Sequence, residues 1–351
     1  MQTEQIIINL CKKYSLGELQ NMPLPVEGGL LHRMYHVTTD QRNYAIKLLN
    51  PDIMRRPEAL QNMINSERIA EAFAHKTGEA IPVVAALKLQ GRHLLSLQPD
   101  YEDGFPAESA GNADIVYALV YPWREARSLF APEIDMVHCQ RIGQILGRIH
   151  HAELQLEGIE REEAHRPLYN WQNYMAMADE QHVPWLSEYK IMLPNLTRWD
   201  RAATQAMEIV ASFQVISHRD LDPKNVLWQG KEPWIIDWEA AGYISPYQEL
   251  LEVLNYWGRD KDGNYSRTLC QTLLQEYTQH MDLRKADWPP VFACSYDNML
   301  GWLEYTLKKS LGLEGDGQAR MQGPEQLLAA YAELKRYDAQ TEILWKILKQ
   351  S

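Results

Sequence analysis

The sequence contains few cysteines, and none of them falls in a metal-binding or disulfide pattern. Only four occur among 351 residues, and no two form a C-x-x-C pair. This spacing argues against a zinc site and against a disulfide framework. We therefore expect buried thiols in a reducing compartment. The four residues are Cys11, Cys139, Cys270 and Cys294.

Long apolar runs and a secretory leader are also missing. No stretch approaches the roughly 18 apolar residues that a membrane-spanning helix needs. The first residues, MQTEQI, lack a basic region followed by an apolar run, so they do not resemble a signal peptide. We expect a cytoplasmic protein without a membrane partner.

Basic residues are outnumbered by acidic ones. The chain has 35 Lys and Arg against 47 Asp and Glu, for a net charge of −12. This balance disfavours a nucleic-acid partner, which needs a basic face. It is compatible with a cationic substrate, and equally with an acidic surface that only maintains solubility. The length allows two lobes with a substantial core, and no internal repeat or low-complexity segment is present.

The most informative stretch lies between residues 215 and 239. Two short apolar strands, at residues 226–228 and 234–236, are joined by a turn at residues 229–233. Such a hairpin brings Asp220, Asn225 and Asp237 close together. Two carboxylates and one amide form an all-oxygen donor set, which suits Mg²⁺ and does not suit zinc or copper.

Two motifs in this stretch resemble those of a known family. HRDLDPKN, at residues 218–225, resembles the catalytic loop of kinase-fold phosphotransferases, and Ile236-Asp237 resembles the end of their metal-binding strand. The closest resemblance is to the aminoglycoside phosphotransferase and choline kinase family of small-molecule kinases. It implies that Asp220 faces the substrate hydroxyl and that Asn225 and Asp237 hold magnesium. His218 is expected to brace the loop by hydrogen bonds.

The resemblance also implies a bilobal, protein-kinase-like α+β fold. A small N-lobe with an antiparallel sheet and a leading helix is expected at residues 1–121. A larger, mostly helical C-lobe is expected at residues 122–351. The patterns agree with this division. They predict a leading helix at 3–19, strands at 24–26, 34–38, 44–48 and 115–121, a hairpin of 81–89 with 93–97, and helices over much of 136–211 and 245–351.

The expected nucleotide site lies in the N-lobe. Gly28 and Gly29 join two strands and can let backbone N–H groups approach a phosphate, although the three spaced glycines of protein kinases are missing. Lys47 lies inside an apolar strand, where burial demands an anionic partner. It resembles the kinase lysine that contacts the α- and β-phosphates of ATP. Its expected partner is Glu67, with Glu71 on the same helix face as the alternative.

The expected hinge follows the strand at residues 115–121. Tyr121 and Trp123 are expected to contact the base of the nucleotide with their backbone groups rather than with their side chains. The interval from Asp237 to Pro246 is too short for the activation segment of a regulated protein kinase. Asp222 stands where protein kinases have a lysine, and whether Lys224 reaches the phosphate is open. Both departures favour a small-molecule kinase.

Three acidic residues are candidates for the acceptor site. Asp297 and Glu304 share one face of a helix that begins near Ser295, and Gly301 between them leaves room for a ligand. The alternative is a solvated polar face. Glu239, two residues after Asp237, is expected to contact substrate or magnesium, or to be merely exposed.

The sequence therefore predicts an ATP-dependent (or GTP-dependent) and Mg²⁺-dependent kinase that phosphorylates a hydroxyl of a small polar molecule. The acceptor is an aminoglycoside-like antibiotic, choline or another amino alcohol; no protein partner is evident. Two alternatives stay open. One is a metabolite or protein-linked sugar kinase of the same fold, such as a fructosamine, homoserine or thiamine kinase. The other is a non-catalytic nucleotide-binding regulator.

Overall fold

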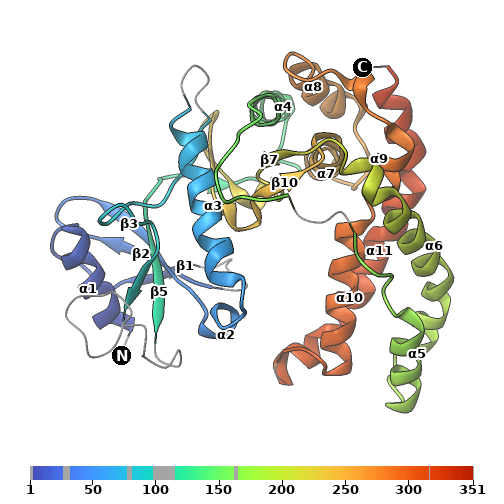
Figure 1. Cartoon of the computed structure of the whole chain (residues 1–351), viewed down its shortest axis with the longest axis horizontal. Helices are drawn as coiled ribbons and strands as arrows, with labels where there is room; N and C mark the ends of the chain where they lie inside the picture. Colours follow the sequence, from blue (N-terminus) through green and yellow to red (C-terminus); the bar gives the residue numbers. More distant parts are fainter. Residues whose placement is uncertain are drawn as a thin grey trace. The chain divides into compact units, whose positions relative to one another are not determined.

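The computed structural model describes residues 3–26, 32–76, 81–97, 115–161, 165–315 and 317–350. The chain forms two compact units (Figure 1). The first comprises Met1–Leu129, Leu156–Ile159 and His218–Gly242, and the second comprises Phe130–Gln155, Glu160–Ser217 and Tyr243–Ser351. The first unit thus extends beyond the N-lobe expected at residues 1–121 and includes the catalytic loop.

A five-stranded antiparallel sheet forms the centre of the first unit, with the strand order β1-β2-β3-β5-β4. Four of its strands lie close to the predicted ranges, because apolar alternation and turn residues define them locally. The strands are β1 (Leu24–Val26), β2 (Arg33–Thr38), β3 (Asn43–Leu48), β4 (Leu95–Leu97) and β5 (Val116–Pro122).

The two faces of this sheet pack against different helices. Ile46 and Val120 are paired across β3 and β5, and both join the core cluster that includes residues of helix α1 (Thr3–Tyr14). Successive side chains of a strand point to opposite faces. Lys47 and its partner Leu119 therefore lie on the other face, where Leu119 packs with Met63 of helix α3 (Ala59–Ala74).

Two local predictions are corrected by the structure. Helix α1 ends at Tyr14, earlier than the range of residues 3–19 predicted for it. Residues 81–89 form no strand, although the predicted turn at residues 90–91 is present, with Leu89 and Arg92 hydrogen-bonded across it. The reason is that this segment divides its hydrogen bonds: Val84 N–H donates to Ile235 O, and Leu87 N–H donates to Val120 O.

The hairpin predicted after the catalytic loop is confirmed. Strand β8 (Val226–Gln229) pairs antiparallel with β9 (Glu232–Ile235), and β6 (Arg127–Ser128) pairs with β8. The turn is tighter than predicted, with Gly230 at φ 61°, a conformation that glycine adopts without steric cost. Short 3₁₀ turns precede and follow the hairpin: η2 (Pro223–Asn225) and η3 (Trp238–Ala240).

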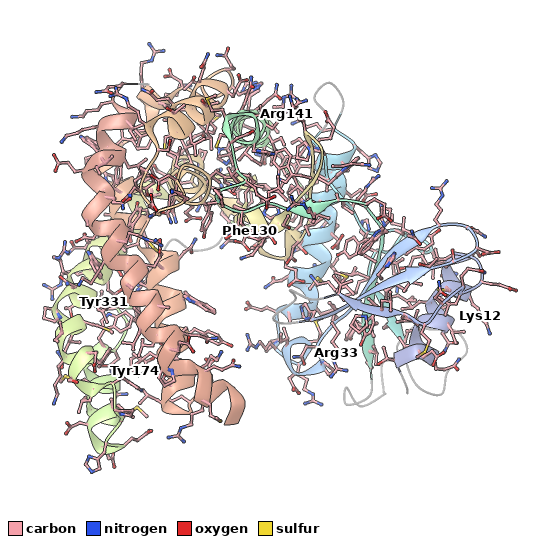
Figure 2. All side chains as sticks on the ribbon, turned by 180° about the vertical axis from the view of Figure 1, so that it is seen from behind. Lys12, Arg33, Phe130, Arg141, Tyr174 and Tyr331 are labelled. Carbon is pink, nitrogen blue, oxygen red and sulfur yellow. The ribbon has the colours of Figure 1, made fainter. Side chains whose placement is uncertain are left out.

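Helices dominate the second unit, as predicted. One buried cluster joins α5 (Trp171–Glu180), α6 (Leu186–Val210), α10 (Asp297–Leu311) and α11 (Gly317–Leu348). Its aromatic members include Tyr174 and Tyr331 (Figure 2). Strands β7 (Val215–Ser217) and β10 (Gly242–Ile244) pair in a separate two-stranded sheet. The helices are α4 (Met136–His151), α5 (Trp171–Glu180), α6 (Leu186–Val210), α7 (Pro246–Trp257), α8 (Arg267–Tyr277), α9 (Trp288–Cys294), α10 (Asp297–Leu311) and α11 (Gly317–Leu348).

The remaining elements are short: α2 (Pro51–Met54) and the 3₁₀ turn η4 (Leu283–Lys285). All four cysteines are buried free thiols, which confirms the prediction made from their spacing. Among the helices of the described ranges, none combines the length and the apolar character needed to cross a membrane.

Candidate active site

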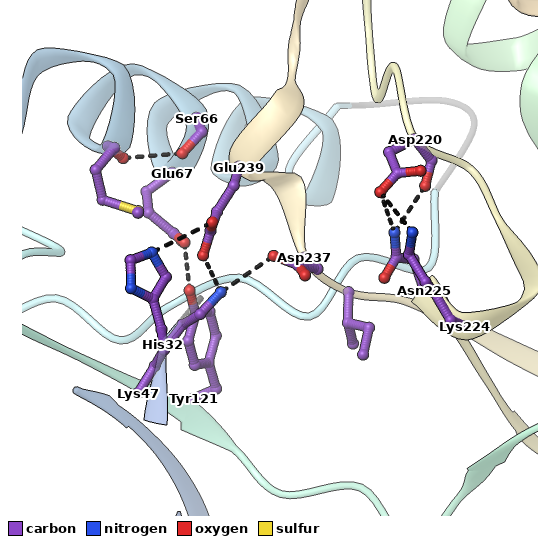
Figure 3. A network of polar contacts seen from close by, with 12 residues as sticks. His32, Lys47, Ser66, Glu67, Tyr121, Asp220, Lys224, Asn225, Asp237 and Glu239 are labelled. Atoms are coloured by element: carbon purple, nitrogen blue, oxygen red, sulfur yellow. Dashed lines mark hydrogen bonds and ion pairs between the residues drawn. The ribbon is translucent and has the colours of Figure 1, made fainter. Parts of the chain in front are cut away.

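The catalytic loop is held together by contacts between its own side chains. The amide Nδ2 of Asn225 donates to the main-chain oxygen of Asp220 at 2.8 Å and to its Oδ2 at 2.9 Å. Lys224 Nζ lies 3.3 Å from the same Oδ2 (Figure 3). Asp222 begins the turn, since its carboxylate accepts from Lys224 N–H at 2.8 Å. The carboxylate of Asp220 therefore has a defined orientation.

Burial raises the pKa of the Asp220 carboxyl, and the positive charge of Lys224 opposes part of that rise. A raised pKa makes the carboxylate a better proton acceptor. The arrangement suits a group that orients a hydroxyl and accepts its proton.

His218 connects the loop to the end of strand β9. Its side chain is fully buried, and its Nε2 lies 3.0 Å from the main-chain oxygen of Ile236. Nδ1 accepts the N–H of Asp220 at 3.3 Å, so the Nε2 position carries the proton. The ring also lies edge-on to Trp238, with 4.6 Å between ring centroids. These contacts are those of a bracing residue.

Asp237 lies where strand β9 turns into η3. Its φ is 59°, the left-handed region that residues other than glycine rarely adopt, and Arg219 in the catalytic loop has φ 66°. Strained backbone of this kind is found where surrounding contacts impose it, often at functional sites. The Asp237 side chain is 43% exposed, which leaves carboxylate surface for a ligand.

The donor set fits a magnesium ion that is shared with a bound phosphate. Because Nδ2 of Asn225 donates to Asp220, its Oδ1 is the atom that faces away from that contact. Main-chain pairing of Ile236 N–H with Asn225 O, at 3.0 Å, keeps Asn225 beside Asp237. Within the described residues, no group of three or more His, Cys, Asp or Glu side chains is arranged to hold a metal. Mg²⁺ commonly needs only one or two protein oxygens beside phosphate and water.

The structure pairs Lys47 differently from the prediction. Its buried Nζ contacts Asp237 Oδ1 at 3.1 Å and also hydrogen-bonds Glu239 (Figure 3). Neither Glu67 nor Glu71 forms a hydrogen bond or ion pair with it. Burial by itself would lower the pKa of Lys47, but the charges of Asp237 and Glu239 outweigh it and raise that pKa. Lys47 is therefore a buried ammonium that binds the two acidic residues after strand β9, Asp237 and Glu239.

Glu67 and Glu71 have other partners. The buried Glu67 accepts from the Tyr121 hydroxyl through Oε1 and from Ala86 N–H, at 3.2 Å, through Oε2. Burial raises the pKa of Glu67, and the hydrogen bond from Tyr121 opposes that rise. Glu71 pairs with a different cation and a different ring: Lys88 Nζ at 2.5 Å and His93 Nε2 at 3.2 Å.

Glu239 is more tightly engaged than sequence reasoning anticipated. Burial would raise its pKa, but the hydrogen bond from His32 and the charge of Lys47 outweigh burial and lower that pKa to about 2. Its Oε2 lies 3.4 Å from His32 Nε2. His32 was missed in the sequence because nothing in its strand-flanking position indicates a partner more than 200 residues away.

The remaining nucleotide-site candidates are only partly described. Tyr121 uses its side chain for Glu67, a contact that sequence reasoning did not predict. Trp123 N–H donates to Asn43 O at 3.2 Å, and its ring stacks on His36 with 4.0 Å between centroids. Gly28 and Gly29 lie outside the described residues.

The two acids on helix α10 are engaged within the second unit. Asp297 Oδ1 accepts from Arg166 Nε at 2.8 Å. Glu304 accepts from the Tyr174 hydroxyl and lies 2.8 Å from Lys308 Nζ. Their side chains are 26% and 13% exposed, which does not fit the alternative of a solvated polar face. Their role toward an acceptor stays a prediction.

Known structures share this fold. Spectinomycin phosphotransferase, solved with ADP and spectinomycin, aligns with TM-score 0.67 at 14% identity, over 94% of this chain and 96% of that one. Choline kinase from Cryptosporidium parvum aligns with TM-score 0.59 at 11% identity, over 96% and 97%. A microcompartment-associated aminopropanol kinase aligns with TM-score 0.59 at 13% identity, over 95% and 98%. At such identities the likeness establishes the kinase-like fold, as expected from the sequence.

Sequence comparison identifies the family. No curated protein matches the chain. Residues 24–283, however, match the model of the phosphotransferase enzyme family (APH). The matched range includes the catalytic loop, the hairpin after it and Lys47. Because it covers more than half of the chain, this protein belongs to the phosphotransferase enzyme family.

Proposed function

We propose that this protein transfers the γ-phosphoryl group of ATP, or of GTP, to a hydroxyl group of a small polar molecule. The observation that carries the proposal is the grouping of Asp220, Asn225, Asp237 and Lys47 in one compact unit. It combines an oriented carboxylate, two oxygen donors for a hard cation and a buried ammonium. Phosphoryl transfer needs these parts because its catalysis consists mainly of positioning and charge stabilisation.

In this reaction Asp220 orients the acceptor hydroxyl and takes its proton. The acceptor oxygen forms a bond to the γ-phosphorus while the bond to the β,γ-bridging oxygen breaks, releasing ADP or GDP. Asn225 and Asp237 would hold Mg²⁺, which neutralises charge on the phosphates. Lys47 holds phosphate oxygens after exchanging a carboxylate contact for them. His218 keeps the loop and the strand end in register.

The acceptor class we propose is an alcohol with a cationic nitrogen, such as an aminoglycoside-like antibiotic, choline or another amino alcohol. Support comes from the acidic net charge and from the acids on helix α10. The named molecules spectinomycin, choline and aminopropanol, to whose kinases this chain is similar in fold, are all nitrogen-containing alcohols.

The test is nucleotide turnover with a panel of acceptors. Purified protein is incubated with Mg²⁺ and ATP or GTP, and with aminoglycosides, choline, aminopropanol, homoserine, thiamine or sugars. Phosphorylated product is detected by mass spectrometry, with the Asp220→Asn variant as the control. Product with one acceptor class, absent in the variant, supports the proposal. Nucleotide binding without turnover on any acceptor would instead favour a nucleotide-binding regulator.

A further inference from the structure

The buried ammonium of Lys47 is bound to the turn that follows strand β9. Only 8% of the residue is exposed, so each contact made by Nζ replaces solvent that the charge has lost. Its two carboxylate partners come from this region: Glu239 belongs to η3, and Asp237 is the residue immediately before η3. A charge-assisted hydrogen bond in such a place fixes the donor more strongly than a neutral one.

The carboxylate of Glu239 has a second partner, His32, which orients it. Its two oxygens have different partners: Oε1 accepts from Lys47, and Oε2 lies 3.4 Å from Nε2 of His32. The tautomer of His32 follows from its other nitrogen, because Nδ1 accepts the N–H of Asn50 at 3.0 Å. Nε2 therefore carries a proton and donates to Glu239. The contacts of His32 with Glu239 and of Glu239 with Lys47, drawn in Figure 3, use no hydrogen bond from helix α3.

Both carboxylate oxygens of Glu67, on helix α3, already accept hydrogen bonds from other groups. Oε1 accepts from Tyr121 and Oε2 from the N–H of Ala86. Both donors are neutral, and both lie on segments that pack beside helix α3. Glu67 consequently fastens the helix to strand β5 and to the segment before β4.

We propose that Glu239, oriented by His32, is the residue that positions Lys47 for the nucleotide phosphates, and that Glu67 is an anchor of helix α3. The kinetic part of this inference rests on the proposed function, whereas the pairing itself does not. One consequence is that Lys47 and the metal-site Asp237 are positioned by the same turn. Displacing helix α3 would then leave the lysine in place, so this helix would not act as an on–off switch.

The pairing is tested in the ligand-free protein by double-mutant cycles of urea unfolding. Lys47→Met is combined with Glu239→Gln in one cycle and with Glu67→Gln in a second. We expect Glu239→Gln to destabilise the wild-type protein and to be neutral or stabilising beside Lys47→Met, since the ion pair is then already lost. The Glu67 cycle should be nearly additive. Equal or larger coupling in the Glu67 cycle would overturn the inference.

The chain supplies a matched control in Glu71. Its carboxylate also lies between a lysine and a histidine, Lys88 and His93, and its side chain is 28% exposed against 26% for Glu239. Glu71→Gln should show no coupling to Lys47→Met. It should also leave the Kd for ADP unchanged, because its cation is not Lys47.

Calorimetric titration with ADP, with Mg²⁺ and then with a chelator, tests the positioning role. Losing one charge-assisted contact corresponds to a rise in Kd of roughly tenfold or more for Glu239→Gln. The rise should appear with and without Mg²⁺, and Glu239→Asp should not restore binding, because its carboxylate is one methylene shorter.

An increase in the Kd for ADP that is seen only with Mg²⁺, together with an additive unfolding cycle, would make Glu239 a metal ligand and overturn the inference. If the wild-type protein binds no nucleotide, the proposed function fails, while the unfolding cycles still decide which glutamate holds Lys47.

Discussion

Asn225 donates its side-chain amide to Asp220 twice, at 2.8 Å to the main-chain oxygen and at 2.9 Å to Oδ2. The contact joins the expected metal-binding residue to the expected base. It orients the Asp220 carboxylate and also turns the amide oxygen of Asn225 away from it. A change at Asn225 should therefore affect both groups, whereas a change at Asp220 should separate the chemistry from nucleotide binding.

Replacing Asp220 by Asn should abolish most turnover and leave nucleotide binding almost intact. The variant keeps the shape of the side chain and loses the proton acceptor, whose contribution is typically about 10²- to 10⁴-fold. Steady-state turnover and calorimetric titration with ADP measure the two effects. Turnover near that of the wild type would remove Asp220 from the mechanism.

Replacing Asp237 by Ala should weaken Mg²⁺-dependent nucleotide binding and turnover together, because a carboxylate ligand is removed. The measurement is the Kd for ADP with Mg²⁺ and with a chelator. Asp52→Asn serves as the control, since that side chain is 81% exposed and pairs only with Arg55 at the surface. An unchanged Mg²⁺ dependence would contradict the metal assignment.

Replacing Lys224 by Met should move the acid limb of the kcat/KM profile to higher pH. Burial raises the pKa of Asp220 and the charge of Lys224 lowers it, so removing that charge raises the pKa further. Activity depends on the ionised carboxylate and is lost as pH falls through this pKa, so the loss begins at a higher pH in the variant. The exposed Lys231, in the hairpin turn, provides a Lys→Met control. A limb that does not move would show that Asp220 does not control it.

Neutralising both acids of helix α10, by Asp297→Asn with Glu304→Gln, should raise the acceptor KM and leave the ATP KM unchanged. The proposed acceptor carries positive charge, so its binding should also become less sensitive to ionic strength. Steady-state kinetics at low and high salt measure both effects. An unchanged acceptor KM would confine these acids to their contacts with Arg166 and Lys308.

Replacing Asp200 by Ala should destabilise the protein by about 3–5 kcal/mol, as expected when one partner of a buried ion pair is removed. This carboxylate is buried, lies 2.7 Å from Arg166 Nη1 and accepts from Trp171 Nε1 at 2.9 Å. Urea unfolding gives the change in the free energy of unfolding. The exposed pair of Asp179 with Lys190 supplies the control, and Asp179→Ala should alter stability by less than about 1 kcal/mol. Similar values for both variants would contradict a structural role for Asp200.

Much of the fold and part of the site followed from the sequence because they depend on neighbours along the chain. Strand β5 and the β8–β9 hairpin show apolar runs next to turn residues. Asp220 and Asn225 are five residues apart in one loop, and Asp237 follows the hairpin directly, so their proximity requires only that the hairpin forms. The buried thiols, the helical second unit and the family resemblance were likewise readable without coordinates.

The tertiary structure alone decided which carboxylate holds Lys47. Glu67 and Glu239 are both plausible by residue type, and helical or strand periodicity states only which face a side chain occupies. Residues 81–89 illustrate the same limit, because their hydrogen bonds go to strand β5 and to Ile235, two partners far apart in the chain. Local patterns specify an element and its faces. How the elements pack decides which distant groups come together. A buried charge then pairs with an opposite charge that lies within its reach.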